Sequence, residues 1–232
     1  MSEKSTVCIG IRFELYILSN APLTRVFQVR ADPPRVLSSS WDKTIKLWDT
    51  TQCRTLMTFL FHEAMVYSVV WSPRISGAFA STAADGRLFI WNSNQSAPQL
   101  TIQASSSELL TGDWCKYNEN IVATGGCDGI IKCWDLRAPS APVVTLSGHE
   151  RAVRKVVFSG HRESIISSVS YDFTTRVWDV RRCVGGKTSP LLRTFYNHSE
   201  FAYGLDLNLT IPGMAADCGW DQLVVVSDIG LE

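Results

Sequence analysis

A histidine, a serine and an aspartate lie close together in the sequence, in a combination that could support nucleophilic catalysis. His149 precedes an apolar, β-branched run, Ser170 ends the next such run, and Asp172 lies in the turn that follows. In a hydrolase with these residue types, the histidine removes the serine proton and the aspartate orients the imidazole. The same groups have a second use, because a buried imidazole, hydroxyl, carboxylate and indole can satisfy one another's hydrogen bonds. Trp178 supplies the indole six residues after Asp172.

The spacing of these residues repeats along the chain, which favours the structural use over the catalytic one. A nucleophile is expected once per chain and needs oxyanion donors, whereas the aspartate pattern occurs in every repeat. The pairs six residues apart are Asp42 and Trp48, Asp85 and Trp91, Asp128 and Trp134, Asp172 and Trp178, and Asp221 and Ser227. We therefore predict buried polar networks rather than an active site. Their predicted members are His62, Asp85 and Trp91 in one repeat, and His149, Ser170, Asp172 and Trp178 in another.

The repeat also predicts the fold. The positions six residues after each aspartate are 43, 43, 44 and 49 residues apart. A period of about 40–45 residues with Trp-Asp endings is typical of the WD-repeat β-propeller, in which each repeat forms a blade of four antiparallel strands. Runs of small residues such as FASTA at 79–83 predict strands packed between neighbouring sheets, and Asp-Gly at 85–86 predicts a hairpin. We predict an all-β fold with about five WD-repeat blades in residues 35–232.

Several repeats depart from the full pattern. Ser105 stands where a histidine is expected, and Ser227 replaces the last tryptophan. Ala83, Gly126 and Gly219 occupy positions where we expect the network serine or threonine. We therefore expect those blades to be less rigid than the blade built on His149.

Residues 1–34 form an atypical N-terminal segment. They contain neither the Asp-to-Trp spacing nor an entry histidine. Short strands are expected at 15–18 and 25–29, next to a first blade that otherwise lacks its innermost strand.

Composition and charge exclude several functional classes. The 232 residues carry 22 Lys and Arg against 22 Asp and Glu, so no net field gathers nucleic acid or anionic lipid. No apolar run approaches the roughly 18 residues of a membrane span, and the N-terminus does not have the pattern of a secretory signal. Seven cysteines without a CxxC pair indicate reduced thiols in a cytosolic or nuclear compartment. We predict neither a metal site nor a cofactor.

Residues outside the generic repeat carry a closer resemblance. The stretches DWCKYNEN (113–120), SYDFTTRVWD (170–179) and AADCGWD (215–221) resemble the WD-repeat peroxins, the receptors for the type 2 peroxisomal targeting signal. The resemblance covers about Arg35 to Val226, and DWCKYNEN is its most specific part. Members of that family resemble seven-bladed rings, so five blades imply an incomplete ring.

The resemblance implies a receptor function without catalysis. Such a receptor binds matrix proteins in the cytoplasm, through an N-terminal nine-residue signal, and cycles to the peroxisome. The signal has a basic and an aliphatic residue, five variable positions, then His or Gln and a small or aliphatic residue. These end positions fall on one face of an amphipathic helix. The family also uses a peroxin co-receptor and the peroxisomal docking machinery.

Propeller geometry predicts which residues would bind such a peptide. The residue before each turn aspartate, and those three and five places after the histidine position, are expected on one face of the ring. Together with acids further along the innermost strands, the candidates are Trp41, Tyr67, Glu108, Asp113, Arg154, Tyr171, Phe201, Tyr203, Asp206 and Trp220. The aromatic residues suit an interface hot spot, or they pack between blades. The acids either receive the basic residue of the signal or are solvated, which is the default for a surface carboxylate.

Two other functions remain open on the sequence. One is a WD-repeat scaffold or adaptor for another protein complex, because fold does not specify function. The other is a shortened receptor with reduced binding. An enzyme is least supported, because GxxxxGK[ST], HExxH and GxSxG motifs are absent.

Overall fold

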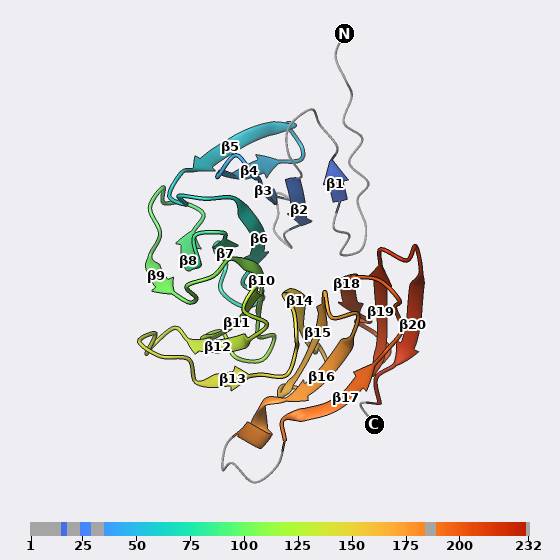
Figure 1. Cartoon of the computed structure of the whole chain (residues 1–232). Helices are drawn as coiled ribbons and strands as arrows, with labels where there is room; N and C mark the ends of the chain where they lie inside the picture. The colour runs from blue at the N-terminus through green and yellow to red at the C-terminus, as the bar shows by residue number, and fades with distance from the viewer. Residues whose placement is uncertain (1–14, 18–23, 29–34, 184–188, 231–232) are drawn as a thin grey trace.

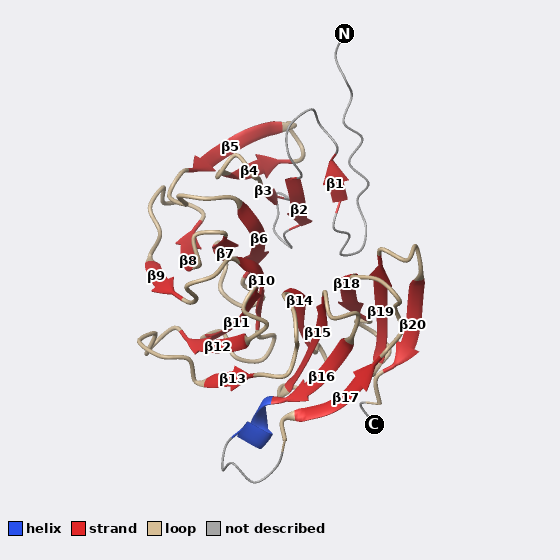
Figure 2. Cartoon of the chain, in the orientation of Figure 1, coloured by secondary structure: helices blue, strands red, loops and turns tan. Residues whose placement is uncertain are grey.

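The structure is a computed structural model that describes residues 15–17, 24–28, 35–183 and 189–230. Within these ranges the chain forms twenty β-strands and one short 3-10 helix at Val180–Cys183. Figure 2 shows strands throughout the described part. The prediction of an all-β fold is confirmed.

The strands form five antiparallel sheets in chain order. The first sheet contains β1 (Leu15–Ile17), β2 (Thr24–Gln28), β3 (Arg35–Ser39), β4 (Ile45–Asp49) and β5 (Arg54–Phe59). The second contains β6 (Val66–Trp71), β7 (Ala78–Ala83), β8 (Arg87–Asn92) and β9 (Leu100–Gln103). The third contains β10 (Leu109–Trp114), β11 (Ile121–Gly126), β12 (Ile131–Asp135) and β13 (Val144–Leu146). The fourth contains β14 (Val153–Phe158), β15 (Ile165–Ser170), β16 (Thr175–Asp179) and β17 (Leu191–Phe195), and the fifth β18 (Ala202–Leu207), β19 (Met214–Gly219) and β20 (Val224–Asp228).

The sheets follow one another round an arc, with β6, β10, β14 and β18 towards its centre (Figure 1). Neighbouring blades contact each other through these inner strands, including β6 with β10 and β10 with β14. The expected strands near residues 15–18 and 25–29 are confirmed as β1 and β2. β2 pairs antiparallel with β3 and so takes the place of the innermost strand of the first blade. The arc is consistent with an incomplete β-propeller.

Small side chains in the second strand of each blade let the sheets pack closely. All six residues of β7 and all six of β15 are buried. Gly125 on β11 shows how tight the fit is, because an added Cβ would lie 2.8 Å from Cγ1 of Val153 in the next blade. The four hydrophobic cores accordingly lie mostly between successive sheets.

The turn between the second and third strands has the same backbone conformation in every blade. The residue after each turn aspartate has a left-handed φ, which glycine adopts without strain. Gly86 and Gly129 have φ of 72° and 73°, so the expected Asp-Gly hairpins are confirmed. Lys43, Phe173 and Gln222 adopt the same conformation in the other blades. We call the side of the arc that carries these turns the turn face.

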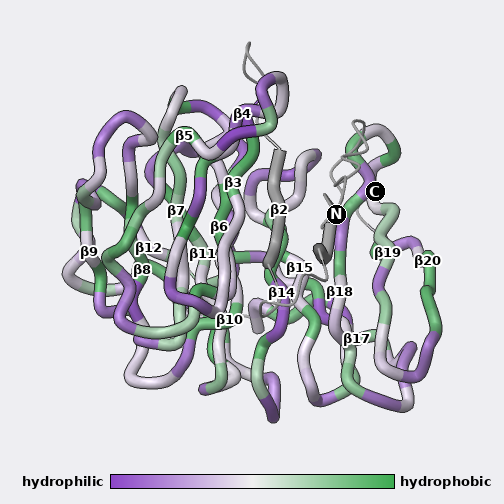
Figure 3. The backbone as a smooth tube through the Cα atoms, turned by 90° about the horizontal axis from the view of Figure 1, so that it is seen from above, coloured by the Kyte–Doolittle hydropathy of each residue, from purple (hydrophilic) through white to green (hydrophobic). Residues whose placement is uncertain are grey.

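The last sheet has three strands among the described residues, so the outer edge of β20 is not paired there. Val224 and Val226 are 73% and 63% exposed, whereas Ile45 and Leu47, at the matching positions of β4, are 1% and 2% exposed. The hydrophobic part of β20 lies at the outer edge of the molecule (green in Figure 3). β20 therefore presents the apolar face that the other blades cover.

Candidate functional site

The serine, histidine, aspartate and tryptophan of the fourth blade form one buried network. Nδ1 of His149 lies 2.8 Å from Oδ2 of Asp172, and Nε2 lies 2.8 Å from Oγ of Ser168. Trp178 donates its indole N–H to the same Oγ at 2.8 Å. A carboxylate only accepts hydrogen bonds, so the His149 proton is on Nδ1, and the Ser168 hydroxyl donates to Nε2. The chain of bonds satisfies all four side chains.

The serine of this network is Ser168, and the expectation of Ser170 was wrong. The Oγ of Ser170 donates to the carbonyl of Arg151 and accepts the backbone N–H of Asp172. The register explains the difference. Trp178 pairs with Ile166, so the diagonal neighbour on the same side of the sheet is Ser168, while Ser170 lies one further pair towards the turn.

In the other blades, too, the network hydroxyl lies two residues before the position that we expected. The indole of each network tryptophan donates to a hydroxyl ten residues earlier: Trp48 to Ser38, Trp91 to Ser81, and Trp134 to Thr124. The second blade is complete, because His62 lies 2.8 Å from both Ser81 and Asp85. Ala83 and Gly126 therefore do not mark a missing hydroxyl. The expectation that the His62 blade has a degenerate network was wrong.

The third blade lacks the histidine, as expected. The hydroxyl of Ser105 replaces the imidazole and donates to Oδ2 of Asp128 at 3.0 Å. The indole and the aspartate are thus satisfied by separate partners.

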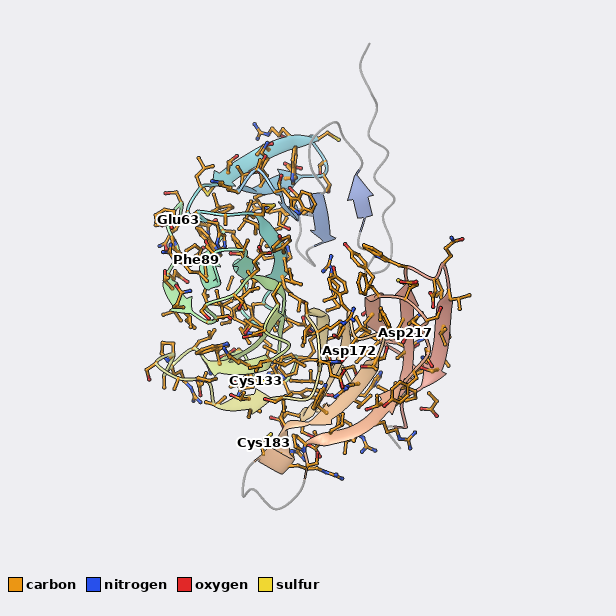
Figure 4. All side chains as sticks on the ribbon, in the orientation of Figure 1. Glu63, Phe89, Cys133, Asp172, Cys183 and Asp217 are labelled. Atoms are coloured by element: carbon orange, nitrogen blue, oxygen red, sulfur yellow. The ribbon has the colours of Figure 1, made fainter. Side chains whose placement is uncertain are left out.

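The last blade uses a carboxylate at the network position. Asp217 occupies the position at which the other blades have serine or threonine. The expectation that Gly219 occupies this position was wrong. The Asp217 carboxylate accepts a hydrogen bond from Thr175 of the neighbouring sheet and one from Asn197. His198 lies 3.0 Å from Asp221 through Nδ1 and 3.7 Å from Asp217 through Nε2. Figure 4 shows Asp217 and Asp172 in neighbouring sheets, so each blade holds its own polar cluster.

Ser168 cannot act as a nucleophile in this arrangement. The residue is 0% exposed, and its oxygen already accepts the Trp178 N–H. A substrate carbonyl has no path to a fully buried hydroxyl, and the same network recurs around Ser81. The geometry therefore supports stability of the blades.

Most of the candidate peptide-binding residues lie at the turn face, where the turn of each of the last four blades is tied to the entry of the inner strand of the same blade. The N–H of Cys127 donates to the carbonyl of Glu108, that of Tyr171 to Ala152, and that of Trp220 to Phe201, at 2.9 to 3.0 Å. These bonds bring the residue before each turn aspartate next to the residue three places after the histidine position. Within this face the structure forms three side-chain groups.

Trp41, Tyr67 and Glu108 form the first group. Tyr67 donates its hydroxyl hydrogen to Oε2 of Glu108 in the next blade at 2.9 Å. The rings of Trp41 and Tyr67 meet edge to face, with centroids 6.5 Å apart. Burial and the Glu108 carboxylate raise the pKa of Tyr67 to about 12, so the phenol remains a donor at neutral pH. The group presents a carboxylate beside two aromatic rings.

Arg154 and Tyr203 form the second group. Nη2 of Arg154 donates to the Tyr203 hydroxyl at 2.6 Å. The guanidinium carbon lies 4.1 Å from the centre of the Tyr203 ring, within cation–π distance. Arg154 is buried, whereas Tyr203 is half-buried.

Tyr171, Phe201 and Trp220 form the third group. The ring of Phe201 lies 4.8 Å from that of Tyr171 and 5.1 Å from that of Trp220. Trp220 is 60% exposed, so the group has an open apolar side. The sequence analysis missed Phe173, whose ring lies 5.8 Å from Phe201. Its place immediately after the turn aspartate was the available signal.

Asp113 and Asp206 lie apart from these groups. Asp113 is buried and accepts the backbone N–H of Phe158 in the next blade at 2.8 Å and the ammonium of Lys116 at 2.7 Å. These contacts join two blades, so the structure gives Asp113 a packing role in place of the expected peptide contact. Asp206 is exposed on β18, where one carboxylate oxygen accepts the N–H of Leu207.

Five antiparallel sheets in an arc, each with a turn aspartate and most with an indole–hydroxyl bond, define a WD-repeat β-propeller. The family model described as WD domain, G-beta repeat matches residues 21–49, 53–92, 100–135 and 140–179. The chain belongs to this family.

Curated relatives confirm the closer resemblance as well. The chain is 46% identical over 193 residues to the peroxisomal targeting signal 2 receptor of Mus musculus, covering 83% of this chain and 59% of that protein. It is 45% identical over 170 residues to the Homo sapiens receptor of the same name, covering 73% and 51%. The E3 ubiquitin-protein ligase COP1 of Arabidopsis thaliana is 31% identical over 168 residues, 71% of this chain and 23% of that protein. The chain thus spans between 51% and 59% of the length of these two receptors.

No helix of the described ranges is long and apolar enough to cross a membrane. The same residues contain no group of three or more His, Cys, Asp or Glu side chains arranged to hold a metal ion.

Proposed function

We propose that this chain binds the N-terminal type 2 targeting signal of peroxisomal matrix proteins on its turn face. The identity of 46% with a receptor of that name supports the ligand class. The observation that carries the site is the first group: Glu108 holds its carboxylate against Tyr67 and beside Trp41, between two blades.

The three groups match the chemistry of the signal. Glu108 can receive the basic residue through a charge-assisted hydrogen bond. The exposed side of Trp220, backed by Phe201 and Tyr171, can cover aliphatic residues on the same face of the signal helix. The end positions of a short amphipathic helix share one side, so a helix lying on the turn face would direct its basic and aliphatic residues towards that face together.

The cellular role that we propose is a non-catalytic receptor. The protein takes up cargo in the cytoplasm, cycles to the peroxisome, and acts with a peroxin co-receptor that covers the bound signal and contacts the docking machinery. Since the chain spans just over half of the related receptors, we propose that it binds the signal more weakly than they do.

Fluorescence anisotropy with a labelled signal peptide tests this proposal. We expect Glu108→Gln and Trp220→Ala each to weaken binding about tenfold, the loss of one charged hydrogen bond or one interface anchor. The matched controls are Glu163→Gln and Leu209→Ala, an exposed acid and an exposed apolar residue outside the three groups. Equal affinity for the signal and a scrambled peptide, or unchanged affinity in both test variants, would contradict the proposal.

A scaffold or adaptor function is the second candidate. The similarity to COP1 over 71% of the chain favours it, because that relative is named as a ubiquitin-protein ligase. The same aromatic groups would then bind an unrelated protein segment. Capture of partners whose binding depends on Trp220 but not on a type 2 signal would favour this function over the receptor.

A further inference from the structure

Arg154 is a buried cation at the inner edge of the fourth blade. The residue is 6% exposed. Nη2 donates to Tyr203, but Nη1 is buried and has no hydrogen-bond acceptor among the described residues. A buried donor without an acceptor usually costs about 1–3 kcal/mol, and more when it is charged.

Arg154 also has no counter-ion in the part of the chain that the structure describes. None of the ion pairs within 4.0 Å in the described part of the chain involves its guanidinium, whereas Arg176 on the same blade pairs with Asp172. Proteins normally pair buried charges, because an isolated one is costly to desolvate. The π-face of Tyr203 compensates only part of that cost.

Glu108, the acid of the first group, is engaged elsewhere. Glu108 raises the pKa of Tyr67 and Arg154 lowers it, so both charged side chains act on the phenol of Tyr67. Glu108 accepts the Tyr67 hydroxyl and forms no ion pair with Arg154 within this structure. The face therefore presents a carboxylate bound to a phenol and a guanidinium whose Nη1 has no acceptor among the described residues.

We infer that Arg154 is a subsite for a carboxylate of the bound polypeptide, contributed by an acidic side chain. A guanidinium is the side chain best suited to this ligand, because its N–H groups match the two carboxylate oxygens. Tyr203 holds the guanidinium from one side and leaves Nη1 for the ligand. The identity of the polypeptide rests on the proposed function, whereas the carboxylate chemistry rests on Arg154 alone. With Glu108 taking a basic residue, the two opposite charges fix the direction in which the peptide lies.

Paired peptides test the inference. Each of the five variable positions of a signal peptide carries glutamate in one peptide and glutamine in its partner, and affinities are measured by anisotropy. We expect one position to favour glutamate about tenfold, as for a charged hydrogen bond. The preference should disappear in Arg154→Met and shrink in Arg154→Lys. The lysine variant keeps the positive charge and so remains available for the test if the methionine variant does not fold. Arg151→Met, which removes an exposed arginine from the same face, should keep the preference.

A second measurement separates this inference from the proposed function. Sodium formate supplies a small carboxylate, and we expect it to raise the melting temperature of the wild type more than sodium chloride at equal ionic strength, but not that of Arg154→Met. If no signal peptide binds while the formate effect is present, the receptor proposal fails and the carboxylate subsite stands. If peptides bind without any glutamate preference, the inference fails and the receptor proposal stands. A formate effect without such a preference shows a small-anion site and also overturns the polypeptide assignment.

Discussion

Nε2 of His149 lies 2.8 Å from Oγ of Ser168, and the same oxygen accepts the indole N–H of Trp178. Replacing Ser168 by alanine leaves a buried indole N–H and a buried imidazole nitrogen without partners. We expect Ser168→Ala to lower the free energy of unfolding by about 3 kcal/mol, measured by urea denaturation.

Ser167 provides a matched control on the same strand. Its hydroxyl is buried and has no hydrogen-bond partner among the residues that the structure describes, so Ser167→Ala should be neutral or slightly stabilising. Equal destabilisation by both substitutions would show that strand packing, and not the network, accounts for the effect.

The His149–Asp172 pair makes stability depend on pH. Burial lowers the pKa of His149 from 6.5, so the folded protein keeps it neutral while the unfolded chain takes up a proton. Burial alone would raise the pKa of Asp172, but the hydrogen bonds from His149 and Thr174 outweigh it and hold that pKa well below 3.8. In both cases the unfolded state binds more protons as the pH falls, so acid removes stability.

We expect the free energy of unfolding to fall from about pH 7 to pH 5, with a slope of at most about 1.4 kcal/mol per pH unit for this histidine. The Asp172 contribution is present above about pH 4 and is lost on further acidification. His149→Gln should flatten the slope between pH 7 and pH 5, and Ser167→Ala should leave it unchanged. A stability that rises on acidification over this interval would contradict the assigned proton positions.

Asp113 and Glu108 should respond in opposite ways to substitution. Asp113→Ala leaves the buried N–H of Phe158 without an acceptor and Lys116 without its carboxylate, so we expect a loss of about 3 kcal/mol in stability. The affinity of the folded protein for a signal peptide should not change. Glu108→Gln should change affinity while costing less than about 1 kcal/mol of stability, since Gln still accepts from Tyr67. A large affinity loss in folded Asp113→Ala would return Asp113 to the binding site.

The exposed valines of β20 should promote self-association. An unpaired strand edge with apolar side chains is a template for pairing with another chain, and a lysine on the edge suppresses this. Val226→Lys should raise the monomer fraction in size-exclusion chromatography with light scattering. Thr101→Lys, on the outermost strand of the second sheet, should have no such effect, and an equal gain from both would indicate general charge repulsion.

The fold could be predicted from the repeat because the turn geometry is local. Each turn aspartate, such as Asp42, is followed by a residue with a left-handed φ. The third strand of the blade ends about six residues after the aspartate, so one short pattern defines a hairpin. The serine of the network could not be placed with the same certainty. Its position depends on the register between β15 and β16, and a choice between Ser168 and Ser170 on the same side of the strand needs that register. The constant ten-residue interval to the tryptophan was the signal that would have identified it.

The sequence predicts which residues lie on the turn face, but not which side chains they contact. Trp41 and Trp220 follow from their place before a turn aspartate, and Tyr67 from its place five residues after a histidine. The structure brings Trp41 to Tyr67 and Trp220 to Phe201. The role of Asp113 depends on contact with β14 across a blade boundary, at a separation of 45 residues. That Arg154 has no counter-ion among the described residues is likewise a property of the assembled sheets.

The arc has a consequence for how the protein opens. The sheet containing β10 contacts β6 on one side and β14 on the other, whereas β18 contacts β14 and β15 as its main partners outside its own sheet. In a linear array of units, each stabilised by its neighbours, the ends unravel while the middle stays closed. Amide hydrogens of β11 and β15 would then exchange last, and those of β19 early. A ligand that contacts both Trp41 and Trp220 would hold the first and last blades together. Its binding would then slow amide hydrogen exchange in strands of the end blades that the ligand does not contact.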